Sequence, residues 1–351
     1  MITGAELPAG RRLVRAALAE PGVDRVVAVG AHPSQRRLFS TIDGDAELVV
    51  APFVLDDPRL STLCEGATRL VLAGPRSGLD VDGTGGSELH LAATRSFLVM
   101  LARVADVTTM VVLSSALVYG ARPENPVPLS ESAPVDPNLV ITAAVDRAEL
   151  ERLCAIWARS RGATCAFVRP CVVVGPENGR WLARSPWSTS GLLVSDPGPV
   201  QFVHIDDLVD AMAVVCRARI DGPVNVAPDG WLSYAQVRAL RGPTARLRLS
   251  RPVAVVLARL GKAFGFAPVE PETLVAVSAP WVVANERLRS LGWEPTHSNE
   301  EAYVEADRGG PWSRLTPRHR QQIALGAAGV AGLGTIATIA VLVRRRLMSV
   351  R

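Results

Sequence analysis

Strand-like and helix-like blocks alternate through the first 115 residues, and this alternation limits the fold more than any other feature of the chain. The strand-like blocks are short, apolar and rich in β-branched residues, and they occupy residues 25–29, 47–50, 69–73 and 109–114. Segments with helical spacing of apolar residues separate them, notably 11–20 and 89–104. Strands that alternate with helices predict βαβ units and a parallel sheet. We therefore expect an α/β fold with a Rossmann-type doubly wound parallel sheet.

The remaining sequence indicates how the chain is divided. Further strands are expected at 164–168, 201–203 and 223–226, and a long helix at 143–160. We predict a nucleotide-binding core over residues 1–226, in which the Trp-, Pro- and Ser-rich segment 179–200 is a loop over the site. Residues 227–306 are expected to form a smaller C-terminal lobe, followed by a linker at 307–322.

The C-terminal segment 323–343 contains 21 residues and no charged side chain. As a helix it would be about 31 Å long, which is close to the thickness of a bilayer core. We expect one C-terminal transmembrane helix, with a basic tail at 344–351; a buried hydrophobic helix is the alternative. Because no export signal precedes the first strand, the prediction is a cell-membrane protein with a single C-terminal span and its soluble domain in the cytoplasm.

Composition excludes several functional classes. The net charge of +4 is small, and the arginines are scattered without a basic stripe, so we expect no nucleic-acid partner. The five cysteines are odd in number and lack metal-ligand spacing, which predicts reduced thiols and no metal site. The length of 351 residues suits one large α/β domain with a lobe, or two modest domains.

Several motifs occur in a fixed order along residues 1–306. They are TGAELPAG at 3–10, SSALVYG at 114–120, LSESAPVDP at 129–137, RP at 169–170 with VGP at 174–176, FVHIDDL at 202–208, VNV at 224–226 and LGW at 291–293. Together they resemble the extended short-chain dehydrogenase/reductases, in particular the NAD-dependent epimerase/dehydratase family. The resemblance implies a Rossmann core that binds NAD or NADP, a small-molecule ligand such as a nucleotide-sugar, and a homodimer.

The resemblance also implies which residues surround the cofactor, and three of them depart from the family pattern: Leu7, Gly30 and His90, which aligns with the family's helix Asn. The implied positions are Thr3, Gly4, Leu7, Gly10, Gly30, Ala73, His90 and Pro170. Glycines in the phosphate turn allow the backbone to approach the pyrophosphate, but Leu7 occupies the middle glycine position. Gly30 stands where an acidic residue usually holds the adenosine ribose. We therefore expect weak binding of NAD or NADP.

The catalytic pattern is incomplete. The family uses a Ser or Thr, a Tyr as acid or base, and a Lys that lowers the pKa of the Tyr. Ser115 matches the first role, whereas alignment places Ala143 at the Tyr and Arg147 at the Lys. The only lysine of the chain is Lys262, and no Tyr-x-x-x-Lys pair exists.

Two interpretations of this gap remain open. The first is a membrane-anchored, catalytically impaired or ligand-binding pseudoenzyme of the family. The alternative is an active NAD(P)-dependent nucleotide-sugar epimerase, dehydratase or reductase with an atypical proton donor. For an NADP-dependent reductase, Gly30 followed by Arg36 and Arg37 would admit a 2′-phosphate.

A polar cluster at His204, Asp206 and Asp207 has a structural interpretation. Acidic residues near a helix N-terminus interact favourably with the helix dipole. We therefore interpret this cluster as the start of a helix.

Overall fold

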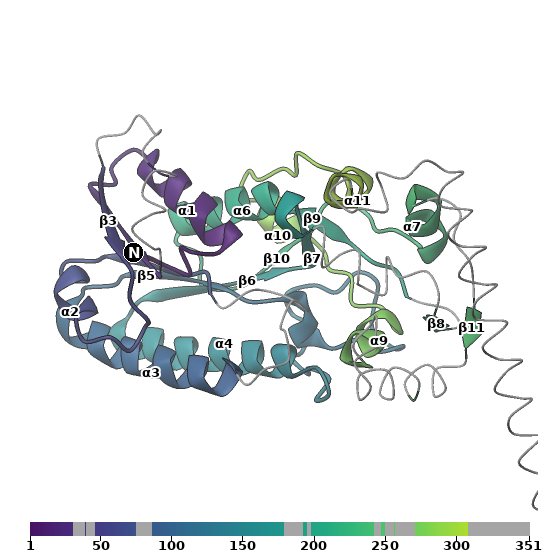
Figure 1. Ribbon diagram of the computed structural model, residues 1–351, viewed down its shortest axis with the longest axis horizontal. Helices are drawn as coiled ribbons and strands as arrows, with labels where there is room; N and C mark the ends of the chain where they lie inside the picture. The colour runs from purple at the N-terminus through teal and green to yellow at the C-terminus, as the bar shows by residue number, and fades with distance from the viewer. Residues whose placement is uncertain are drawn as a thin grey trace, which may run out of the picture.

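The computed structural model has a seven-stranded, fully parallel sheet at its centre (Figure 1). The structure describes residues 1–30, 39, 46–74, 86–178, 192–194, 198–241, 247–249, 256 and 271–307. The strands lie in the order β10-β6-β5-β4-β1-β2-β3. Their bounds are β1 Ile2–Thr3, β2 Arg25–Val29, β3 Glu47–Ala51, β4 Arg69–Leu72, β5 Thr109–Leu113, β6 Thr164–Pro170 and β10 Gly222–Val226. This order confirms the predicted Rossmann-type doubly wound sheet.

Helices cover both faces of the sheet, which explains why the central strands are apolar runs and not alternating patterns. On one face lie α1 (Pro8–Leu18) and α6 (Ile205–Ala218), and on the other lie α3 (Gly86–Val104) and α4 (Thr142–Arg161), as Figure 1 shows. The short helix α2 (Leu60–Leu63) packs beside α3. All five residues of β5 are buried between these layers.

The two faces have separate hydrophobic cores. Leu13 and Val14 of α1 belong to the same buried cluster as Leu208 and Met212 of α6. The cluster on the opposite face is formed by residues of α3 and α4 together with alternate residues of the strands, among them Phe97, Leu101, Leu150 and Cys154. The alternation of side chains along each strand supplies both clusters from one sheet.

The remaining described elements follow the core strands or connect them. Two short parallel pairs join β7 (Val172–Val174) to β9 (Phe202–His204) and β8 (Leu192–Val194) to β11 (Leu247–Leu249). The other elements are η2 (Ala116–Tyr119), η3 (Pro176–Asn178), α7 (Tyr234–Arg241), α9 (Pro271–Val277), α10 (Glu286–Arg289) and α11 (Asn299–Asp307). The expected division at residue 226 remains a prediction, and most of the expected loop 179–200 lies outside the described residues.

The predicted membrane anchor is corrected. Within the part of the chain that the structure describes, no helix is both long and apolar enough to cross a bilayer. The two described helices of sufficient length, α3 and α4, carry charged residues, including Arg95 in α3 and Glu149 in α4, and charges are costly in a hydrocarbon core. The transmembrane part of the fold prediction and the cell-membrane localisation derived from it were therefore wrong. Segment 323–343 lies outside the described residues, as do the tail 344–351 and residues 308–322 of the expected linker.

Replacement of Gly10 by alanine tests the packing of α1 against the end of β1. A Cβ atom at this position would lie 2.1 Å from the carbonyl oxygen of Gly4, which is backbone and cannot turn aside. We expect Gly10→Ala to lower the free energy of unfolding by about 1–3 kcal/mol, the usual cost of overpacking. Urea denaturation measures this loss; an unchanged midpoint would mean that α1 can shift without cost.

Candidate functional site

The candidate site lies where β1 and β4 end side by side at the centre of the sheet. Ligands of open parallel sheets bind outside the carboxyl ends of the strands, at the point where the strand order reverses. Gly4, directly after β1, has a φ of +65°, and a Cβ on it would lie 2.8 Å from the backbone nitrogen of Gly74. The chain therefore passes close to the end of β4 only because residue 4 has no side chain.

Leu7 is placed across this junction. It is the N-cap residue of α1, its backbone is extended, and its amide donates to the Gly4 carbonyl at 2.9 Å. A Cβ built on Gly74 would lie 3.8 Å from Leu7 Cδ1, so the leucine side chain extends over the end of β4. An apolar side chain thus occupies space beside the helix N-terminus, where a diphosphate would bind.

Glu6 is a site residue that the sequence analysis missed. Gly30 follows β2 with a φ of +91°, and a Cβ on it would lie only 2.2 Å from Glu6 Oε2. The Glu6 carboxylate therefore lies against the end of β2, where the family's acidic residue is expected. The sequence did show an acidic residue inside the phosphate turn. Its contact with Gly30, however, joins two segments whose spacing along the chain gives no sign that they meet.

A buried polar network crosses the ends of β5, β6 and β10. Arg169 of β6 donates two hydrogen bonds to the Glu151 carboxylate, at 2.9 and 2.6 Å, and Ser114 Oγ donates to the same carboxylate at 2.5 Å. The Arg169 guanidinium also lies 4.8 Å from the Tyr119 ring centre. Tyr119 in turn donates to Asn225 Oδ1 at 2.8 Å. Burial alone would lower the pKa of Arg169, but its bonds to Glu151 outweigh that effect and raise the pKa.

The two predicted catalytic residues both have structural partners. Arg147 is 5% exposed, and its Nη1 donates to the carbonyl oxygen of Leu113, the last residue of β5, at 2.7 Å. Burial lowers the pKa of Arg147 to about 10, against the opposing influence of Asp146 and Glu151. Ser115 is buried, and its Oγ accepts from the Leu117 amide at 3.2 Å as the N-cap of η2.

Most of the predicted cofactor residues come together in the fold. Thr3 and Gly4 at the end of β1, Leu7 and Gly10 at the start of α1, Gly30 after β2 and Ala73 after β4 all lie at the same junction. Pro170 ends β6, so it lies beyond β5 from this junction. His90 is in α3, but its side chain is outside the described part of the structure.

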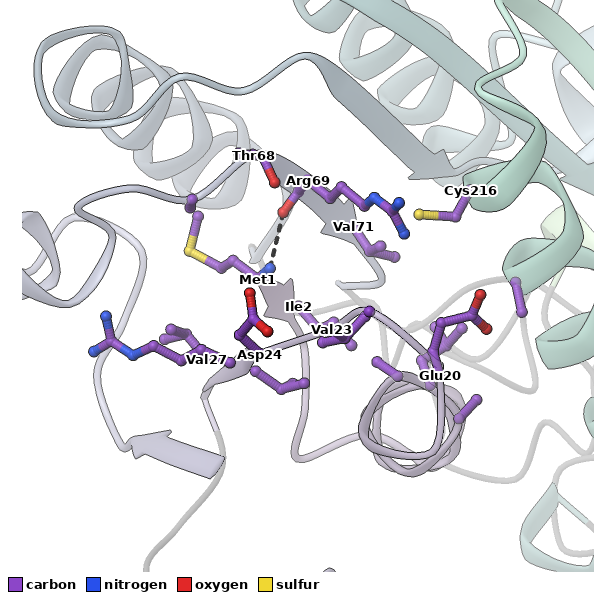
Figure 2. Close-up of a pocket in the computed structure, with 18 of the residues that line it drawn as sticks. Met1, Ile2, Glu20, Val23, Asp24, Val27, Thr68, Arg69, Val71 and Cys216 are labelled. Carbon is purple, nitrogen blue, oxygen red and sulfur yellow. Dashed lines mark hydrogen bonds between the residues drawn. The ribbon is translucent and has the colours of Figure 1, made fainter. Parts of the chain in front are cut away.

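A cavity of about 630 Å³ lies at the amino ends of the strands, opposite the candidate site (Figure 2). It is lined by Met1 and Ile2, by Arg25 at the start of β2, and by Thr68 and Arg69 at the start of β4. The Met1 amino group donates to the Arg69 carbonyl at 2.8 Å, and burial lowers its pKa to about 6. Because these are the amino ends of the strands, this cavity is not where a Rossmann cofactor binds.

Comparison with known proteins agrees with this geometry. The sequence profile described as the NAD dependent epimerase/dehydratase family matches residues 1–227. The chain therefore belongs to the NAD-dependent epimerase/dehydratase family, as the motifs predicted.

The curated relatives are distant. A 3-diazoavenalumate denitrifying reductase of a Streptomyces species is 27% identical over 312 residues, which cover 81% of this chain and 87% of the relative. An uncharacterized protein of Mycobacterium tuberculosis is 24% identical over 337 residues, covering 91% and 86%.

Solved structures share the fold at low identity. The dTDP-glucose 4,6-dehydratase DesIV of Streptomyces venezuelae, solved with NAD bound, aligns with a TM-score of 0.65 and 18% identity over 89% of this chain and 96% of that one. The UDP-glucose 4-epimerase of Thermus thermophilus in complex with NAD aligns with a TM-score of 0.62 and 17% identity, covering 90% and 99%.

The buried network offers a matched pair of variants on α4. In Glu151→Gln, Arg169 would keep a buried charge without a charged partner, and breaking a buried pair costs about 3–5 kcal/mol. Glu149 forms a comparable bidentate pair with Arg152, at 2.8 and 2.6 Å, but both side chains are exposed. We therefore expect urea denaturation to give a large loss for Glu151→Gln and little change for Glu149→Gln. Equal losses would mean that burial of the first pair is unimportant.

Proposed function

We propose that this chain is a ligand-binding member of the epimerase/dehydratase family that has lost the family's Tyr–Lys proton relay. The observation that carries the proposal is the orientation of Arg147. Its guanidinium donates to the Leu113 carbonyl inside the protein, whereas a catalytic lysine must direct its charge toward the tyrosine and the nicotinamide ribose. Arginine is also a poor substitute, since its planar group does not reproduce the geometry of an ammonium ion.

Tyr119 is poorly suited to replace the lost acid. Ala143 stands at the Tyr position and has no proton to give. Tyr119 is buried, donates its hydroxyl hydrogen to Asn225, and has a pKa that burial raises. General acids work best when their pKa lies near the operating pH. These properties favour a structural role for Tyr119.

The junction between β1 and β4 fits one half of a dinucleotide better than the other. Gly4 and Gly10 have the close backbone packing of a phosphate turn, and the Glu6 carboxylate lies at the end of β2, where it would accept from ribose hydroxyls. Leu7 lies beside the helix N-terminus where a diphosphate would bind, and Arg147, at the position of the family's lysine, donates to the Leu113 carbonyl. NAD or NADP, when bound, would supply hydride transfer. The residues present favour weak binding.

The comparisons support a proposal for the ligand class. Neighbours in the fold are described with NAD and with sugar nucleotides, such as UDP-glucose in MoeE5. We therefore propose a small nucleotide, such as a nucleotide-sugar, as the class of ligand. A homodimer remains a prediction.

A second candidate is an active reductase with an atypical proton donor. The Streptomyces relative is named as a reductase and covers most of this chain. Arg36 and Arg37, which would favour NADP, lie outside the described residues. Tight cofactor binding would move this candidate to first place.

Calorimetric titration of the full chain with NAD, NADH, NADP and NADPH tests the binding proposal. Loss of one charge-assisted contact costs about 1.5–3 kcal/mol, so the missing lysine contact to the nicotinamide ribose and the Leu7 side chain together should leave dissociation constants near or above about 1 mM. A dissociation constant below about 10 μM would contradict the proposal.

Variants test the proposed roles of Leu7 and Glu6 separately. Leu7→Gly should tighten NAD binding at least about tenfold, the equivalent of roughly 1.4 kcal/mol, because it clears the diphosphate path. Glu6→Gln added to Leu7→Gly should reverse this gain, whereas the exposed Glu65→Gln should not. If Glu6→Gln has no effect, the carboxylate at the end of β2 does not hold the ribose.

Restoring the relay residues tests whether only the relay is missing. We expect the double variant Ala143→Tyr with Arg147→Lys to show no turnover of common nucleotide-sugars, because the general acid also needs a correctly placed nicotinamide. The assay follows absorbance of the reduced cofactor and the sugar products. Turnover by this variant would mean that the cofactor site was intact and that Leu7 is no obstacle.

A further inference from the structure

Two histidines and a glutamate that are far apart in the sequence meet on the α6 side of the sheet. His204 ends β9 and is the N-cap of α6, His297 precedes α11, and Glu305 lies on α11. One ligand atom from each of the three side chains lies within 4.8 Å of the others. Glu305 Oε2 is 3.8 Å from His204 Nε2 and 3.9 Å from His297 Nε2. The two imidazole nitrogens therefore face the same carboxylate oxygen.

The buried end of His204 lacks a partner. The residue is only 2% exposed, and its Nε2 has no hydrogen-bond partner among the described residues. Glu305 Oε2 is too distant to accept a hydrogen bond from it. Buried polar atoms are normally satisfied, and one that is not often marks an ion or water site.

The outer contacts of His297 match those of a metal ligand. His297 Nδ1 lies 3.0 Å from Asp207 Oδ2, and that buried carboxylate also accepts from the His297 amide at 3.1 Å and the Thr296 amide at 2.9 Å. A proton on Nδ1 is thereby held by Asp207, which leaves the Nε2 lone pair available. Metal-binding histidines usually donate their second nitrogen to a carboxylate in this way.

A small rearrangement would complete a coordination sphere. The two rings stack with centres 4.1 Å apart and planes at 30°, so one ring must turn for both lone pairs to converge. His297 and Glu305 are partly exposed, at 27% and 42% of their side chains, and can move. Bond lengths of 2.0–2.2 Å give donor separations of about 3.3 Å in a tetrahedral site, about half an ångström shorter than the two distances to Glu305 Oε2.

The proton on His204 must also change position. Its Nδ1 now accepts a long bond of 3.3 Å from the Asp206 amide. Ligation through Nε2 would place the proton on Nδ1. The carboxylate oxygen Oδ2 of Asp206 lies 3.6 Å from Nδ1 and would accept a hydrogen bond after a small shift.

We propose that His204, His297 and Glu305 bind a divalent transition-metal ion, with zinc as the ion that two imidazoles and one carboxylate favour. Three protein ligands leave the fourth position for water. The ion would link β9 and the start of α6 to α11, and it would stabilise the packing of α11 on the core. This site is independent of the dinucleotide site at Gly4, and binding of an ion here would contradict our expectation from the sequence that the chain has no metal site.

Metal titration of the full chain tests the proposal. The metal-stripped protein is titrated with Zn²⁺ against a chromophoric chelator, and with Co²⁺, whose absorption in the visible range reports tetrahedral nitrogen and oxygen ligands. We expect one ion at this site. His297→Ala and Glu305→Gln should each weaken binding at least about tenfold, while Glu300→Gln, which removes an exposed charge from the same helix, should leave it unchanged.

Thermal unfolding gives a second readout. An ion that binds only the folded state raises the unfolding midpoint as its concentration increases. Zinc should stabilise the wild type and Glu300→Gln but not His297→Ala or Glu305→Gln. The proposal is overturned if the wild type binds no zinc, or if the two ligand variants bind and respond as the wild type does; the histidines would then form only a stacked pair.

Discussion

The buried ion pair between Glu151 and Arg169 is the interaction on which the arrangement of the carboxyl ends of β5, β6 and β10 depends. It joins α4 to β6, and through Ser114 and Tyr119 it reaches the chain after β5 and, by way of Asn225, β10. Both charged side chains are almost fully buried, at 5% and 7% exposed. A buried pair of this kind persists only when every partner is in place, because either charge alone would be costly. The strand ends are therefore held in one arrangement.

Arg147 is part of the same arrangement. Arg147 is one helical turn from Glu151, on the same buried face of α4, and it satisfies the last carbonyl of β5. In the family, this helix presents a Tyr and a Lys to the nicotinamide. Here the same face of the helix serves the internal packing.

The opposite face of the sheet is organised by charge contacts around α6. Arg12 of α1 bonds to Asp206 at 2.6 Å and to Glu177 of η3 at 2.8 Å. Asp207, the next residue, accepts from the chain that leads into α11. Adjacent carboxylates at the start of α6 therefore contact two different segments, one N-terminal and one C-terminal. His297 of the proposed metal site contacts Asp207, so an ion bound there would link the start of α6 to α11.

The sequence by itself determined the sheet, the family and the gaps in the catalytic pattern, because these are written in local periodicity and in motifs of adjacent residues. Apolar β-branched runs predicted the strands, and the missing Tyr-x-x-x-Lys pair was visible without coordinates. The sequence analysis wrongly predicted a transmembrane helix at the uncharged segment 323–343, because hydropathy alone does not establish a spanning helix. Only the tertiary structure placed Glu6 against Gly30, directed Arg147 inward, and brought His204 to His297 and Glu305. Those contacts depend on how turns and helices pack after the chain has folded, and no spacing along the sequence encodes them.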